Sequence, residues 1–60
     1  MIILKKEKNY RIIAEKNKFN GLYDIYNQGR MIFGGWDSIL LKERLTKQQV
    51  ENLKLAIDNL

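Results

Sequence analysis

The chain has 60 residues, of which 45% are hydrophobic and 30% charged, and its formal net charge is +4 at pH 7. This length leaves room for one domain, and a domain this small buries only about 60% of the surface that its unfolded chain exposes. Cys and His are absent, which excludes disulfide bridges and the usual zinc ligand sets. The apolar content is too high for a disordered segment, so we expect one small binding domain over residues 1–60.

The N-terminal segment predicts a short strand at about residues 2–5. Its apolar run ends after four residues at Lys5 and Lys6, so it is too short for a signal peptide or a membrane span. We therefore expect a cytoplasmic protein with no membrane partner. Ile, Lys and Asn together supply 22 of the 60 residues, a bias typical of an AT-rich coding sequence. This composition suggests a complete small reading frame from an AT-rich bacterium or one of its phages.

Two further strands are predicted at about residues 10–15 and 22–26, where aromatic and β-branched residues are frequent. The dipeptide Asn20-Gly21 is a strong turn signal between them. In the first of these strands Tyr10, Ile12 and Ala14 alternate as the apolar set, so we expect them to face the core. We expect Tyr23 and Ile25 to share that face.

A hairpin is predicted from Leu22 to Phe33. Asn27-Gln28-Gly29 fits a three-residue loop in which Gly29 supplies the left-handed residue. The returning strand is expected at about residues 30–34, with Met31 and Phe33 on the core face. Gly34-Gly35 then fits a tight bend that leads into helical structure.

The remaining residues predict a short helical turn at about 38–44 and a helix at about 47–59. Thr46 and Gln49 have the spacing of a capping box. Apolar residues recur behind them at helical intervals, which indicates one apolar stripe; they are Val50, Leu53, Ala56, Ile57 and Leu60.

Together these elements predict an α+β fold: a small antiparallel meander of three to four strands packed by a C-terminal helix. Because the helix has one stripe, it covers one face of the sheet and leaves the other open. The open face is predicted to carry apolar and charged residues together, which suits a contact surface; it should include Arg11, Ile13, Leu22, Asp24, Tyr26, Arg30 and Ile32.

The net positive charge comes entirely from the first third of the chain. Residues 1–20 hold six cations and two anions, whereas the other 40 residues hold five of each. This asymmetry favours either an anionic partner or a simple solvated surface. We expect Lys5, Lys6 and Lys8 to give electrostatic support to a partner-binding site formed by Arg11, Tyr26, Arg30 and Ile32. Trp36, the single tryptophan, is either an anchor of that site or a plug at the end of the core.

No pattern in the chain predicts catalysis. Nucleophile and base pairs, paired carboxylates and metal-ligand spacings are missing, and Gly34-Gly35 lacks the remaining residues of a phosphate-binding loop. We therefore expect a protein that is not an enzyme and that uses no metal or cofactor.

Three functions fit these patterns. The first is a binding protein that occupies a surface of a larger, acidic protein or nucleoprotein complex, such as a phage-encoded inhibitor of a CRISPR nuclease or another defence protein. The second is a nucleic-acid-binding module that uses the sheet face and the basic first third; the predicted outline over residues 10–58 is similar to the arm-type DNA-binding domains of some transposon integrases, although no residue motif is shared. The third is a homodimer through the open face or an edge strand.

Overall fold

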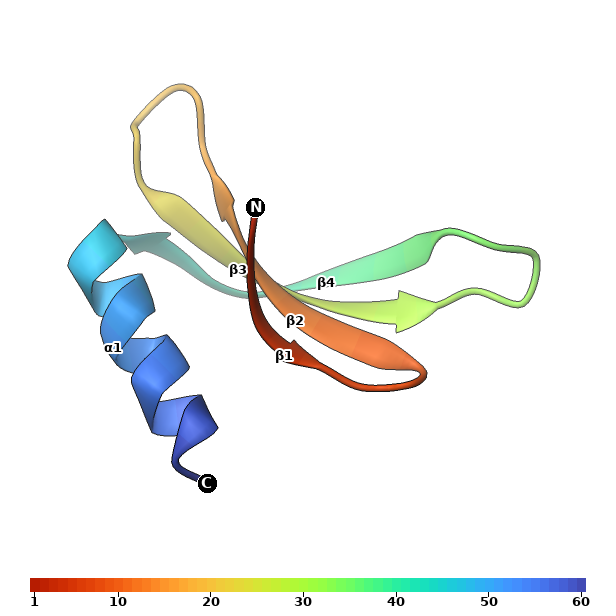
Figure 1. Ribbon diagram of the computed structural model, residues 1–60. Helices are drawn as coiled ribbons and strands as arrows, with labels where there is room; N and C mark the ends of the chain where they lie inside the picture. Colours follow the sequence, from red (N-terminus) through yellow and green to blue (C-terminus); the bar gives the residue numbers. More distant parts are fainter.

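The computed structural model describes all of residues 1–60 as one four-stranded antiparallel sheet followed by a single helix. The strands are neighbours in chain order, so the sheet is a meander, and the predicted α+β fold class is confirmed. In Figure 1 the helix lies against one end of the sheet, while the β3–β4 hairpin extends away from it. The elements are β1 (Ile2–Lys6), β2 (Tyr10–Lys16), β3 (Tyr23–Arg30), β4 (Trp36–Leu45) and α1 (Lys47–Asp58).

The core lies between the sheet and α1 and is small. Its buried members are Leu4, Ala14, Ile25, Leu45 and Val50. The stripe on α1 contributes Val50, Leu53 and Ile57, as predicted, whereas Ala56 and Leu60 are exposed. On the expected core face of β2, Ile12 and Ala14 both pack with Tyr23 of β3, whereas Tyr10 is not among the residues of the core.

The helix begins as the sequence predicts. The Thr46 side chain accepts a hydrogen bond from the Gln49 N–H at 3.2 Å, and the Gln49 side chain accepts one from the Thr46 N–H at 2.8 Å. This capping box satisfies two backbone donors that the first turn otherwise leaves free. No helix in the structure has both the length and the apolar character needed to cross a lipid bilayer.

The predicted hairpin and helical turn were placed wrongly. Residues 27–29 belong to β3, where they pair with β2 from Asn27 to Gly29, and Gly29 does not have a positive φ. The chain instead reverses at residues 31–35, in which Gly34 (φ 95°) and Gly35 (φ 79°) adopt left-handed conformations. The expected strand at 30–34 is therefore the end of β3 and a loop, and Met31 and Phe33 are exposed.

The predicted helical turn at 38–44 is part of β4. Two register shifts occur where β4 pairs with the segment from Tyr23 to Tyr26, and Arg44 next to them has φ 60°. Extra residues of this kind bend a strand and interrupt its alternation. The apolar run Ile39-Leu40-Leu41 therefore lacks the period of a regular strand, and sequence periodicity alone favoured a helix.

Candidate functional site

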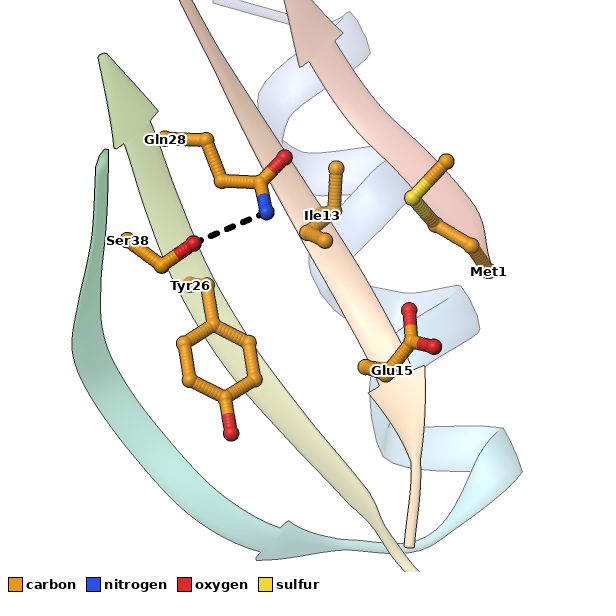
Figure 2. Close-up of a pocket in the computed structure, with 6 residues that line it drawn as sticks. All are labelled: Met1, Ile13, Glu15, Tyr26, Gln28 and Ser38. Atoms are coloured by element: carbon orange, nitrogen blue, oxygen red, sulfur yellow. Dashed lines mark hydrogen bonds between the residues drawn. The ribbon is translucent and has the colours of Figure 1, made fainter. Parts of the chain in front are cut away.

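The open face of the sheet carries a row of hydrogen-bonded polar side chains. The antiparallel register places Arg11 opposite Gln28, and Gln28 opposite Ser38. Arg11 Nε donates to Gln28 Oε1 at 2.6 Å, and Gln28 Nε2 donates to Ser38 Oγ at 2.9 Å. The Gln28 amide thus links three strands and fixes the position of the Arg11 guanidinium. Figure 2 shows the hydrogen bond between Gln28 and Ser38 beside the Tyr26 side chain.

A cation–π cluster lies next to this row. The Arg11 guanidinium carbon is 4.3 Å from the centre of the Trp36 ring, and that of Arg30 is 5.4 Å from it. Such contacts stabilise by about 0.5–1 kcal/mol each at exposed sites. Trp36 opens β4 opposite Arg30, and the ring is half-buried. We call Arg11, Arg30 and Trp36 the basic–aromatic cluster.

The middle of the open face is apolar and hollowed. Ile13 pairs with Tyr26, Ile3 pairs with Ile13 on one side, and Leu40 pairs with Tyr26 on the other. A cavity of about 290 Å³ opens here, and Figure 2 shows its lining residues, which are Met1, Ile13, Glu15, Tyr26, Gln28 and Ser38. Ile13 itself is only 3% exposed, so Tyr26 and the partly exposed residues around it supply the accessible apolar surface.

The other end of the open face is acidic. Glu15 of β2 lies directly opposite Asp24 of β3. Asp24 accepts a hydrogen bond from the Arg44 N–H at 3.3 Å, but the one ion pair in the structure joins Lys54 and Asp58 on α1. Two like charges directly opposite each other destabilise a strand pair. The open face therefore runs from a cationic end through an apolar centre to an acidic end.

The structure brings most of the predicted site residues together. Arg11, Tyr26 and Arg30 lie on the open face as predicted, and Trp36 lies there too, so it does not plug the core between the sheet and α1. Lys6 lies opposite Arg11 and adds to the cationic end.

Three predicted residues lie elsewhere. Lys5 pairs with Ile12, whose side chain packs against the core, so Lys5 lies on the helix side of the sheet. Lys8 lies in the β1–β2 turn. Ile32 was expected on the open face, but it lies at the tip of the β3–β4 hairpin and is 95% exposed, because the chain turns at residues 31–35.

Gln28, Ser38 and Leu40 were missed because their segments were assigned to a loop and a helical turn. A signal was present in the alternation of Asp24, Tyr26, Gln28 and Arg30, which continues one strand face through the assumed loop. No group of three or more acidic, Cys or His residues lies close enough to hold a metal ion.

Comparisons of the chain with family models, curated proteins and solved structures gave no match. A functional assignment therefore depends on the geometry and chemistry of the open face.

Proposed function

We propose that the protein is a non-catalytic binding module that covers a surface of a larger protein with its open sheet face. The observation that supports this proposal is the basic–aromatic cluster beside the Tyr26 hollow, on the side of the sheet that α1 leaves uncovered. Trp, Tyr and Arg are the residues most enriched among the energetic anchors of protein interfaces. Here Arg11 is held by its hydrogen bond to Gln28, and Arg11 and Arg30 both contact the Trp36 ring within the free protein, which lowers the ordering cost of binding.

The chemistry of the face indicates what the partner surface offers. An apolar projection suits the apolar half of the hollow, which Met1, Ile13 and Tyr26 form, and carboxylates suit the exposed edges of Arg11 and Arg30. Bidentate pairing with carboxylates is the geometry for which guanidinium groups are best suited. We therefore expect an acidic rim around an apolar knob on the target.

The finer proposal is that the chain is a phage-encoded inhibitor of host machinery, such as a CRISPR nuclease or another defence protein, that acts in the bacterial cytoplasm. It is supported by the Ile, Lys and Asn bias of the chain, which is typical of an AT-rich coding sequence. A protein without catalytic groups can inhibit a larger one by covering its working surface.

The second candidate function is nucleic-acid binding, which the cationic end (Lys6, Arg11 and Arg30) favours. Two features favour a protein partner instead. Arg11 already lies over the Trp36 ring at 4.3 Å, so a base that stacked on that side would have to displace it. Glu15 and Asp24 at the other end would repel a phosphate backbone that followed the strands.

Affinity capture from a bacterial lysate tests the proposal. We expect the wild-type chain to retain a protein partner that Tyr26→Ala/Arg30→Ala loses, because the double variant removes the wall of the hollow and one cation of the cluster. Lys47→Ala/Glu51→Ala on the exposed side of α1 is the matched control and should retain the partner.

Circular dichroism must show that all three chains are folded. Retention of the partner by the open-face variant would place the working surface elsewhere. Nuclease treatment of the lysate and a salt series with duplex and single-stranded DNA test the second candidate. If the chain binds phosphates, the logarithm of its binding constant for DNA should fall linearly with the logarithm of the salt concentration.

A further inference from the structure

The charges of the open face are arranged symmetrically about its apolar centre. In β2, Arg11 and Glu15 lie two residues to either side of Ile13. In β3, Gln28 and Asp24 lie two residues to either side of Tyr26, which pairs with Ile13. Residues two apart in a strand point to the same face. Arg11 and Glu15 are therefore equidistant from the row formed by Ile3, Ile13, Tyr26 and Leu40, and in β3 the uncharged Gln28 takes the place that mirrors Asp24.

We propose that this face is complementary to itself, so that in the absence of another partner two copies of the chain pack face to face. The two-fold axis lies between the two sheets and runs across the strands, along the apolar row. Rotation about this axis places each strand over the same strand of the second copy in the opposite direction. Arg11 of each copy then comes over Glu15 of the other, and the contact occurs twice.

Charge complementarity favours a second copy as the occupant. The like-charged pair Glu15 and Asp24 destabilises the free chain and has no ion-pair partner within it. Arg11 from the second copy supplies the missing opposite charge at this pair. An isologous contact needs a surface that is its own complement, and an apolar row with opposite charges at equal distances on either side meets that condition.

The apolar centre gives the contact its hydrophobic component. Met1, Ile3 and Leu40 are 64%, 38% and 49% exposed in the free chain, and the cavity beside Tyr26 is open to solvent. A second face laid across them removes this surface from water. Two twisted sheets pack in this way with their strands within about 30° of each other and about 10 Å apart, so the pair of chains forms a β-sandwich with one helix on each outer side.

The small size of the face indicates a weak contact. Four strands about 4.8 Å apart and about seven residues long give a flat footprint of roughly 450 Å². Stable specific complexes bury about 800 Å² per partner. We therefore expect a dissociation constant of about 10 to 500 µM, with a dimer that a tighter-binding partner displaces.

This inference goes beyond the proposed function and is tested separately from it. Both use the open face, so the dimer and a complex with a target exclude each other. Capture of a target reports on the proposed function, whereas the molar mass of the purified chain reports on the dimer. Either result can fail without the other.

Sedimentation equilibrium on the purified chain from about 10 µM to about 1 mM tests the dimer with a charge-swap series. Glu15→Arg and Arg11→Glu each create two like-charged contacts, and we expect each to weaken dimerisation at least about tenfold. The double variant Arg11→Glu/Glu15→Arg restores opposite charges at both contacts and keeps the net charge of the wild type. It should dimerise more tightly than either single variant.

The matched controls are Glu51→Arg and Lys47→Glu, which make the same changes in net charge on the exposed side of α1 and should leave the dimer unchanged. Glu15 is exposed and makes no side-chain hydrogen bond, so Glu15→Arg tests the contact even if Arg11→Glu disturbs the fold. A wild-type chain that stays monomeric up to about 1 mM overturns the proposal. So does a Glu15→Arg chain that dimerises like the wild type, or a folded double variant no tighter than the single ones.

Discussion

Thr46 is the residue at which the sheet ends and the helix begins. It follows Leu45, whose side chain is buried in the core, and its own side chain closes the first turn of α1 through the Gln49 N–H. α1 lacks acidic residues in its first turn and basic residues in its last, so it gains no stabilisation from charges at its ends. The cap is therefore the main local determinant of where the helix starts.

Thr46→Ala should lower the free energy of unfolding by about 1 kcal/mol, because it leaves the Gln49 N–H without its side-chain acceptor. Thr46→Ser keeps the hydroxyl and should remain close to the wild type. Urea denaturation followed by circular dichroism measures both variants. Equal stability of the Ala and Ser variants would show that the hydroxyl at position 46 contributes nothing.

The capping box, the core face of β2 and the Asn20-Gly21 turn could be predicted because each depends on neighbouring residues in the chain. Gly21 has the positive φ that the turn signal implies. The residues of the open face were only partly predictable. Arg11 and Tyr26 follow from alternation, whereas Trp36 and Ser38 join the face only if β4 is a strand, which depends on pairing with β3.

At the scale of elements, the β3–β4 hairpin determines how far the open face extends. The turn at 27–29 predicted from the sequence would have ended β3 before Gln28 and removed the polar row. The pairing of Asn27, Gln28 and Gly29 with β2 lengthens β3 instead, and the reversal moves to residues 31–35. Turn-forming residues occur at both 27–29 and 31–35. The later turn is the one formed, because it allows β3 to make a longer ladder of hydrogen bonds with β2.

Gly34→Ala should destabilise the protein by roughly 1–2 kcal/mol, because φ 95° is a conformation that residues with a Cβ rarely adopt. Gly29→Ala is the matched control. It lies in the same hairpin without a positive φ, and an added Cβ there has no atom within 4 Å. We expect it to be neutral or slightly stabilising. Thermal unfolding of both variants measures the difference in stability. If the two variants lose the same amount of stability, the turn does not lie at Gly34.

The whole molecule is thin, with extents of 34 × 31 × 15 Å. Its accessible surface is 4770 Å², whereas a compact protein of this mass exposes roughly 4100 Å². Six residues are buried and eleven large apolar side chains are exposed. A single sheet with one partly covering helix leaves this much apolar surface in water, and Met1, Ile3 and Leu40 are the part of it that covering the open face would remove.

If dimerisation stabilises the folded chain, the thermal midpoint should depend on protein concentration. We expect the midpoint of the wild type to rise by about 5 °C between about 10 µM and 1 mM, since stabilisation of the order of 1 kcal/mol shifts a domain of this size by several degrees. Glu15→Arg should show no such rise. Calorimetry at the two concentrations measures the shift, and identical midpoints for the wild type would contradict the expectation.

The two register shifts in β4 have a consequence for solubility. An edge strand with three consecutive apolar residues would normally act as a template for further strands and for fibre growth. The inserted residues, together with the left-handed backbone conformation of Arg44, interrupt the regular row of unpaired N–H and C=O groups along this edge. Strand addition along the full length of β4 is therefore disfavoured, and the chain can keep Ile39, Leu40 and Leu41 exposed without recruiting copies of itself edge to edge.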